Sequence, residues 1–397
     1  MDNTNTRCFA PCPRGLEYVL KQELTHLGIQ VSGCTEGGVA FSGSLETLYR
    51  ANLESRIASR ILREIAYIPY RNERDVYTAA FNLPWPQWFS SSRTIKVKVS
   101  ARQCPLKSLD FVTLRIKDAI CDKFMKVQRA RPSVDTQRPD IRIDAFLDPT
   151  HATVYLDTSG EPLFKRGFRH STVEAPLREN LAAGILGLAG WTANQPLLDP
   201  LCGSGTIPLE AAMMARKIAP GLGRHFAFEN MLNFDRALWA SLTEQSRSTQ
   251  LSKSPVLIAA SDKDPRAIEI AREHLRLAGV EQDIQLTQQD LFDVTPPHKP
   301  GIVVMNPPYG VRLGTQEALE ALYPRLGQWM KQHCVGWNVY LLTGDLRAPK
   351  LIGLAPSRRT PLFNGAIECR LYAFPIVQGS MRRTAAHSEE KPGGANP

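Results

Sequence analysis

The stretch VVMNPPYGVR at 303–312 places an amide, two prolines and an aromatic ring directly behind an apolar run. Proline fixes φ and removes a backbone donor, so Pro307 and Pro308 predict a rigid turn with free carbonyls. Asn306 adds a side-chain carbonyl, and Tyr309 adds a flat face on which another ring can stack. We expect these four residues to hold something flat that carries an N–H group. The alternative is an ordinary strand-ending turn, in which Asn and Pro are common.

A glycine turn lies further upstream in the stretch LLDPLCGSGTIPLEAAMMA. The pattern predicts a strand ending at Asp199, a turn with Gly203 and Gly205, and then a helix, an order that is typical of a cofactor site. Pro208 stands where a dinucleotide fingerprint has its third glycine, and no Lys follows the glycines as in a P-loop. NAD and ATP are therefore disfavoured.

Two further acids extend this site to neighbouring strands. Asp262 ends the run VLIAAS, Asp290 follows IQLTQ, and Asn306 follows IVVM. Parallel strands end at one edge of an open α/β sheet, where ligands bind. Ionised carboxylates only accept hydrogen bonds, which suits ribose hydroxyls at Asp262 and an adenine amine at Asp290. The expected ligand is an adenosine compound without phosphates, and S-adenosylmethionine fits. Taken singly, each Asp could instead be a helix cap or turn residue.

The chain has 397 residues and a net charge of +9. Between Arg56 and Arg131 there are 16 Lys and Arg against 6 Asp and Glu, a surplus of ten positive charges. Such a region attracts phosphate backbones, or it is simply a solvated surface. The strand pattern at 94–101 places Lys96 and Lys98 on its polar side, where both could contact RNA.

The rhythm of the pattern changes near residue 162. Before it, helical stripes alternate with short, half-buried strands, as in small α+β units. After it, fully apolar strands alternate with helices, which predicts a doubly wound, mostly parallel sheet. These strands are expected at 196–199, 256–261, 284–288, 302–305 and 338–343, with a last one in 364–376.

Four stretches together resemble one family: APLRENLAA, DPLCGSGTIPLEAA, SDKDPRAIEIAREHLRLAGV and NPPYGVRLG. They are similar to the bacterial guanine-N2 methyltransferases of 23S ribosomal RNA. In that family a Rossmann-like class I methyltransferase domain follows a ferredoxin-like segment and a THUMP RNA-binding domain. The resemblance covers almost all of residues 7–377. It implies a ferredoxin-like segment at 1–45, a THUMP domain at 46–160 and the methyltransferase domain at 163–377, and composition predicts a disordered tail at 378–397.

The resemblance implies methyl transfer from S-adenosylmethionine to the exocyclic N2 of a guanine in RNA, with 23S rRNA or a ribosomal assembly intermediate as partner. Asn306 and Pro307 would accept the hydrogens of the amine, and Tyr309 would stack on the base. Transfer to another amine, such as adenine N6, or to transfer RNA stays open, as does a non-catalytic RNA-binding assembly factor. The sequence does not decide the oligomeric state.

Several residues have two interpretations. Trp85 and Trp88 could stack on RNA or pack in a core, and Arg166 and Arg169 could touch phosphate or be solvated. The eight cysteines show no C-x-x-C pair and no clustered histidines, which argues against a metal site. No secretory leader opens the sequence, and no apolar run reaches the ~20 residues of a membrane span. We therefore expect a cytoplasmic protein that is not inserted in a membrane.

Overall fold

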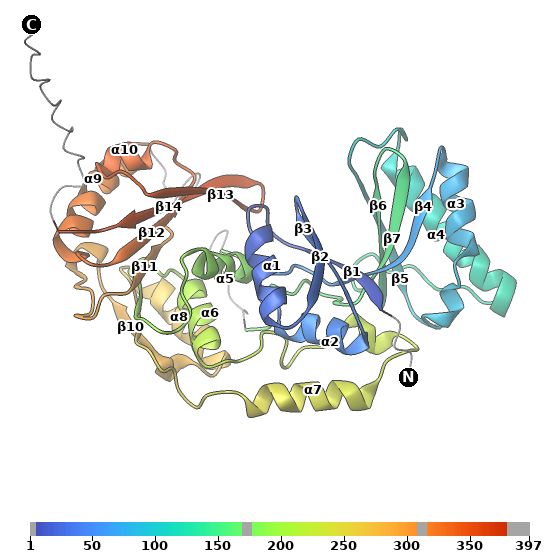
Figure 1. Ribbon diagram of the computed structural model, residues 1–397, viewed down its shortest axis with the longest axis horizontal. Helices are drawn as coiled ribbons and strands as arrows, with labels where there is room; N and C mark the ends of the chain where they lie inside the picture. The colour runs from blue at the N-terminus through green and yellow to red at the C-terminus, as the bar shows by residue number, and fades with distance from the viewer. Residues whose placement is uncertain (1–4, 169–176, 308–315, 379–397) are drawn as a thin grey trace, which may run out of the picture.

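The computed structural model describes residues 5–168, 177–307 and 316–378. In these ranges the strands form two seven-stranded sheets. Figure 1 shows the sheet of the N-terminal half on the right and the sheet of the C-terminal half on the left. None of the helices in the described ranges is long and apolar enough to cross a membrane.

The first sheet has the strand order β2-β3-β1-β4-β7-β6-β5. Its strands are β1 (Thr6–Pro11), β2 (Gln30–Thr35), β3 (Gly38–Gly43), β4 (Leu62–Pro69), β5 (Ile95–Ala101), β6 (Ile141–Leu147) and β7 (His151–Asp157). The helices of this half are α1 (Glu17–His26), α2 (Leu45–Glu54), α3 (Glu73–Asn82) and α4 (Leu109–Gln128). β5 and β6 pair in parallel, and the other pairs are antiparallel. β4 lies between β1 and β7, so it joins the two parts of this sheet.

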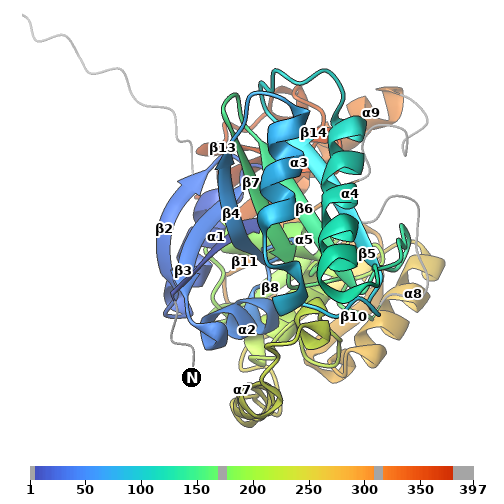
Figure 2. The same cartoon turned by 90° about the vertical axis from the view of Figure 1, so that its right-hand side faces the viewer.

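The strand period decides which side of β5 is covered. Ile95 and Val97 are buried, whereas Lys98 is exposed and Lys96 is half-buried. Figures 1 and 2 show α3 and α4 over one face of β4, β7, β6 and β5. Because successive side chains of a strand point to opposite faces, the lysines lie on the face away from these helices.

The second sheet has the order β10-β9-β8-β11-β12-β14-β13, in which the first five strands are parallel and β14 is antiparallel to both neighbours. Its strands are β8 (Leu197–Asp199), β9 (Ile258–Asp262), β10 (Ile284–Gln288), β11 (Ile302–Met305), β12 (Asn338–Thr343), β13 (Arg358–Asn364) and β14 (Ile367–Pro375). The helices are α5 (Glu179–Leu188), α6 (Thr206–Ala215), α7 (Arg236–Ser248), α8 (Pro265–Leu277), α9 (Gln316–His333) and α10 (Ala348–Ile352). Short 3-10 helices are η1 (Trp85–Gln87), η2 (Ala227–Asn230), η3 (Glu281–Asp283) and η4 (Leu291–Asp293).

β11 shows why these strands are apolar throughout. Ile302 and Val304 belong to a core shared with α6 and α8, while Val303 and Met305 belong to a second core with α9. All four side chains are buried, because helices cover both faces of the sheet. The predicted fold class, α+β domains followed by a mostly parallel doubly wound sheet, is confirmed.

The two halves of the chain share buried contacts. Tyr49 of α2 stacks on Phe228 with ring centroids 4.4 Å apart, and its hydroxyl accepts a hydrogen bond of 2.9 Å from the Asp235 N–H. Asp235 caps α7, which lies below α2 in Figure 1. Arg166, 3% exposed, donates from Nε to Oε1 of Glu210 on α6 at 3.1 Å. Both interpretations of Arg166 from the sequence, phosphate contact and a solvated side chain, are therefore wrong.

Trp85 and Trp88 pack in the core, which was one of their two interpretations. Trp85 is fully buried, and its Nε1 donates to the Ala80 carbonyl at 2.7 Å. Trp88 is half-buried and meets Trp85 edge to face, with ring centroids 5.3 Å apart. Arg169 lies outside the described residues. The domain boundaries expected at 45/46 and near 160–163 stay predictions.

Candidate active site

Polar residues gather at the carboxyl edge of the second sheet. Asp199 ends β8 and Asp262 ends β9, while Asp290 and Asn306 follow β10 and β11. These strands are consecutive neighbours and all run in parallel, so their ends meet at one edge. The structure therefore brings together the four strand ends that the sequence singled out.

The two turn glycines have different surroundings. Both have positive φ, 53° at Gly203 and 79° at Gly205, which favours glycine over other residues. A Cβ on Gly205 would stand 3.0 Å from the Ala271 side chain, so this glycine permits close packing of α6 on α8. A Cβ on Gly203 would meet nothing within 4 Å. Gly203 thus borders open space, where a ligand can approach the backbone.

Asp262 holds the glycine turn in place. Its Oδ2 accepts a hydrogen bond of 2.9 Å from the Gly203 N–H, and its Oδ1 accepts one of 3.0 Å from the Asp264 N–H. A carboxylate has about four lone-pair sites, so acceptor capacity remains for ligand hydroxyls. Asp262 can therefore serve the turn and a ligand together.

Asp199 lies deeper, with 1% of its surface exposed. Oδ1 accepts a hydrogen bond of 3.2 Å from the Leu201 N–H, and Oδ2 is buried without a partner among the described residues. Burial, together with the negative charge of Asp262, raises the pKa of Asp199 to about 8. A cation placed here would restore the ionised carboxylate, so the site favours a positively charged ligand.

Three unsatisfied polar atoms lie at this edge. Of the six side-chain atoms that are buried without hydrogen-bond partners in the described ranges, these are Asp199 Oδ2, Ser261 Oγ and Asn306 Oδ1. They belong to β8, β9 and the residue after β11, which are three adjacent strands. Leaving a buried polar group unpaired costs about 1–3 kcal/mol, so a cluster of them points to a ligand that satisfies them.

Asn306 is positioned by the buried strand β11, whose four residues are fully enclosed. The amide oxygen is an acceptor, so it is suited to an N–H group of a substrate. Pro307 is buried next to it. Pro308 and Tyr309, predicted to complete the turn and stack on a base, lie outside the described residues.

Asp290 caps a short helix, as predicted by the alternative interpretation of this residue as a cap. Its Oδ1 accepts a hydrogen bond of 3.0 Å from the Phe292 N–H and caps η4. A role for the same carboxylate toward an adenine amine stays a prediction.

Sequence reasoning missed one residue that supports the glycine turn. His274 of α8 is buried, and its Nδ1 lies 3.1 Å from the Ser204 carbonyl oxygen. It follows Ala271 by three residues and shares that face of the helix. The helical spacing was visible, but nothing in the sequence placed this face against the turn. Cys202 in the same turn is buried, and burial raises the pKa of its thiol well above the usual range, which fits a packing role.

Comparison with known proteins identifies the parts of the chain. The family model described as the RMKL-like methyltransferase domain matches residues 166–373, more than half of the chain. This chain belongs to the RMKL-like methyltransferase family. The THUMP domain model matches residues 70–157, and that of the RlmL ferredoxin-like domain matches residues 7–62. The family resemblance inferred from the sequence is confirmed.

Relatives of this methyltransferase-family chain include ribosomal RNA enzymes. It is 39% identical over 382 residues to the ribosomal RNA large subunit methyltransferase K/L of Syntrophotalea carbinolica, covering 93% of this chain and 53% of that protein. The chain thus spans about half the length of such K/L relatives. It is 36% identical over 369 residues to a putative RNA methyltransferase of Synechocystis, covering 93% of this chain and 96% of the relative.

A solved structure extends the likeness to nearly the whole fold. A putative methyltransferase complexed with SAH has a TM-score of 0.86 and 30% sequence identity to this chain. The match covers 96% of this chain and 100% of that one. The family fold is therefore present from the first sheet to the last strand of the second.

Proposed function

We propose that this chain transfers a methyl group from S-adenosylmethionine to the exocyclic N2 amine of a guanine in RNA, with 23S rRNA as the substrate. The observation that carries the proposal is the buried, unpartnered Oδ1 of Asn306 at the end of β11. An acceptor kept free in this place suits an amine that must be held by its hydrogens.

The residues at the sheet edge fit the cofactor. Gly203 leaves open space beside the turn, and Asp262 has acceptor capacity for ribose hydroxyls. The raised pKa of Asp199 indicates an environment that a positive charge would relieve. A neighbour of the same fold is complexed with SAH, the product left when S-adenosylmethionine has given up its methyl group.

The chemistry requires little beyond positioning. When bound, S-adenosylmethionine supplies an electrophilic methyl group whose bond to sulfur breaks as the amine nitrogen attacks, leaving a neutral thioether. Asn306 Oδ1 and the Pro307 carbonyl would accept the two hydrogens of the amine, which orients the nitrogen and makes its lone pair more available. The surplus proton of the methylated nitrogen passes to solvent. No strong general base is needed, since the product amine in its charged form is a strong acid.

RNA as the substrate rests on the N-terminal half. Its THUMP match, the basic surplus between Arg56 and Arg131, and relatives named as RNA methyltransferases support this assignment. 23S rRNA is favoured because the K/L relatives are named as large-subunit rRNA enzymes, although the chain covers only about half of their length.

The test is transfer of labelled methyl groups from S-adenosylmethionine into unmodified transcripts of 23S rRNA and of transfer RNA, followed by nucleoside analysis. N2-methylguanosine in the 23S transcript is the expected product, and Asn306→Ala should give none. N6-methyladenosine would replace the guanine assignment. RNA binding without transfer to either RNA would instead favour a non-catalytic assembly factor.

A further inference from the structure

The half-sheet β4-β7-β6-β5 has one face that no α-helix covers among the described residues, and η2 borders one end of that face. α3 and α4 cover the opposite face, as Figures 1 and 2 show. On the uncovered face the strand register places Lys98 beside Asp144, and Ser100 beside Phe146. Phe146 in turn pairs with Thr153, and Thr153 pairs with Tyr67 of β4. Residues paired in this way share a face, which we call the open sheet face.

Aromatic side chains occupy one end of the open sheet face. Tyr67 is 55% exposed and Phe146 is 38% exposed, although large aromatic side chains usually pack in a core. The Tyr67 ring stacks on His151 with centroids 4.3 Å apart and planes 4° from parallel. Two flat surfaces, Phe146 and the Tyr67–His151 pair, are thus presented from neighbouring strands. Exposed rings on an open sheet are platforms on which unpaired bases stack.

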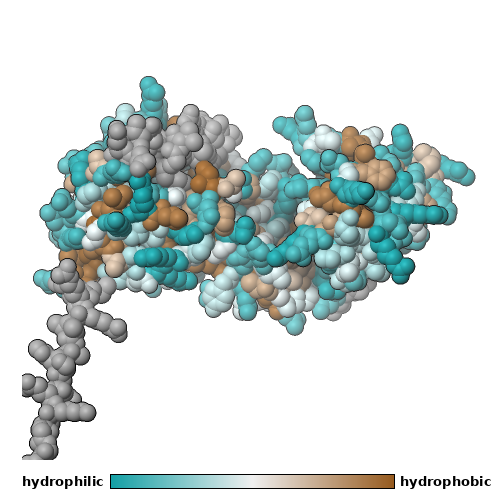
Figure 3. All heavy atoms as spheres, turned by 90° about the horizontal axis from the view of Figure 1, so that it is seen from above, coloured by the Kyte–Doolittle hydropathy of each residue, from teal (hydrophilic) through white to brown (hydrophobic). Residues whose placement is uncertain are grey.

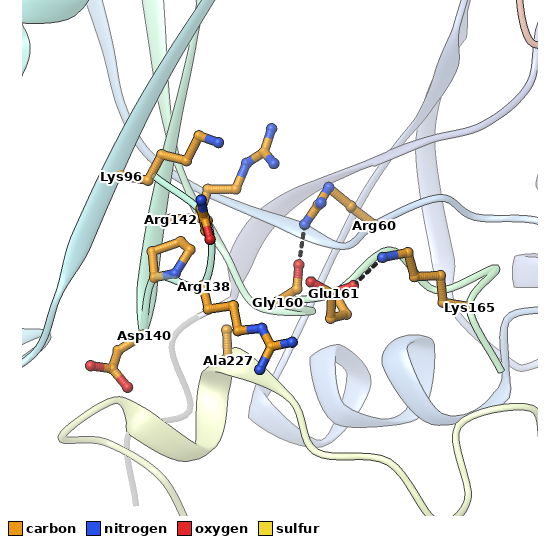
Figure 4. Close-up of a pocket in the computed structure, with 11 residues that line it drawn as sticks. Arg60, Lys96, Arg138, Asp140, Arg142, Gly160, Glu161, Lys165 and Ala227 are labelled. Atoms are coloured by element: carbon orange, nitrogen blue, oxygen red, sulfur yellow. Dashed lines mark hydrogen bonds and ion pairs between the residues drawn. The ribbon is translucent and has the colours of Figure 1, made fainter. Parts of the chain in front are cut away.

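Cationic side chains occupy the other end. They line a cavity of about 620 Å³ where the sheet meets the segment after β7 (Figure 4). The cations that line it are Arg60, Lys96, Arg138, Arg142 and Lys165, and the acids are Asp140 and Glu161. Figure 4 shows Lys96 and Arg142 directed to the same side of the cavity.

Most of these cations already have partners. Arg60 and Arg142 contact the buried Asp157. Arg142 also forms a bidentate ion pair with Asp144, with hydrogen bonds of 2.8 and 3.0 Å. Lys165 pairs with Glu161 at 2.6 Å. These ion pairs hold the side chains of the cavity wall in place. They also neutralise the positive charge of Arg60, Arg142 and Lys165.

Three cations on this path form no ion pair within 4 Å in the described residues, although Asp135 lies near Lys96 and Arg138, and Asp144 lies beside Lys98. Lys96 donates to the Thr136 carbonyl at 2.6 Å, and no ion pair involves Lys98 or Arg138. Lys98 and Arg138 are exposed. Exposed rings and exposed cations on the same sheet face could contact the bases and the phosphates of one single strand.

We propose that a single-stranded segment of the RNA lies along the open sheet face, with bases stacked on Phe146 and Tyr67–His151 and phosphates at Lys98, Arg138 and the cavity. This inference rests on the proposed function, because it assigns the same RNA substrate a path outside the methyl-transfer site. Figure 3 shows the two lobes of the molecule with an indentation between them, and hydrophobic patches among hydrophilic atoms on both lobes.

The test measures binding of a fluorescein-labelled, unstructured 16-nucleotide RNA to the full chain, and of a hairpin duplex with the same composition. Tyr67→Ala and Phe146→Ala should each weaken single-strand binding about five-fold or more, at low and high salt alike. Lys98→Ala/Arg138→Ala should weaken it chiefly at low salt and lower the salt slope by about 1.4, since each phosphate contact of a single strand contributes about 0.7.

Matched controls carry the same chemistry elsewhere on the surface. Phe111→Ala removes a 50% exposed ring from α4, on the covered side of the half-sheet, and Lys21→Ala removes an exposed cation from α1. Both should bind like the wild type. Wild-type affinity in both aromatic variants, or equal losses in the controls, overturns the path. Tighter binding of the wild type to the hairpin duplex than to the single strand would also overturn the path.

The outcome is separable from that of the methylation test. If the wild type methylates RNA while Tyr67→Ala and Phe146→Ala bind and methylate like it, the function stands and the path fails. If the wild type binds the single strand but transfers no methyl group, and the two variants bind it more weakly, the path stands and the function fails. Unchanged unfolding temperatures of the variants show that the fold is intact.

Discussion

The Gly203 N–H donates a hydrogen bond of 2.9 Å to Oδ2 of Asp262, and this bond joins the glycine turn after β8 to the end of β9. Gly203 borders open space, so the bond fixes the backbone at the point where a ligand can approach it. One carboxylate thereby orders the turn and stands next to the space that the turn leaves free. The same relationship makes Asp262 the most direct probe of cofactor binding.

Asp262→Ala should weaken binding of S-adenosylmethionine by about 1.5–3 kcal/mol, because a charged acceptor for the ribose hydroxyls is lost. Asp262→Asn keeps the shape and one carbonyl acceptor, so its loss should be smaller. Titration calorimetry of the folded variants measures both. Glu269→Ala, which removes an exposed carboxylate from α8, is the control and should bind like the wild type. Unchanged affinity in Asp262→Ala would reject the assignment.

The affinity for S-adenosylmethionine should rise with pH between about 6.5 and 8.5. Burial and the charge of Asp262 raise the pKa of Asp199 to about 8, so this carboxyl is mostly protonated at pH 6.5. A cationic ligand favours the ionised form, which becomes available as the pH rises through the raised pKa. We expect roughly a ten-fold gain in affinity across this window.

Calorimetry at both pH values, in buffers of different ionisation enthalpy, would also detect the proton released on binding. Asp199→Asn cannot ionise, so its affinity should be flat over the same range. A wild-type affinity that is independent of pH, or one that falls as the pH rises, is incompatible with a positive charge beside Asp199.

The sequence was most informative where one local pattern decides the structure. β11 and β12 begin and end where the apolar runs at 302–305 and 338–343 do, because strands buried on both faces are apolar throughout. β13 (Arg358–Asn364) was not predicted, since most of its residues are polar and it pairs with β14 alone at the edge of the sheet. Pairing partners are not visible in a strand's own residues.

The candidate site likewise contains residues that the sequence could identify and residues that it could not. The four strand-end residues could be found because parallel strands end at one edge, and the glycine turn is a local motif. The burial of Arg166 could not be found, because its partner Glu210 is 44 residues away and lies in another element. The exposure of Tyr67 also depends on the tertiary fold, since the sheet's other face carries the helices.

Asn306→Ala should abolish methyl transfer while leaving cofactor affinity within about two-fold of the wild type, since the amide is assigned to the target amine. The unliganded variant should be at least as stable as the wild type, because the substitution removes a buried oxygen that has no partner in the described residues. Single-turnover kinetics, calorimetry and thermal unfolding measure the three quantities. Turnover within two-fold of the wild type would rule out the assigned role.

Arg166→Ala should destabilise the fold by about 3–5 kcal/mol, because among the described residues it leaves the buried carboxylate of Glu210 with only Arg56 at 3.9 Å. Denaturant unfolding of the full chain measures the loss. The double variant Arg166→Met/Glu210→Leu should recover much of it, since apolar side chains of similar volume need no partner.

Arg247→Ala breaks an exposed pair with Glu244 and is the control for a charge removed without burial. It should change the free energy of unfolding by less than about 1 kcal/mol. If Arg166→Ala costs no more than this control, the pair does not hold the segment after β7 against α6. A loss in Arg166→Ala that the double variant does not recover would mean that the hydrogen bonds of Arg166 to the Leu163 and Arg56 carbonyls, rather than the ion pair, stabilise the junction.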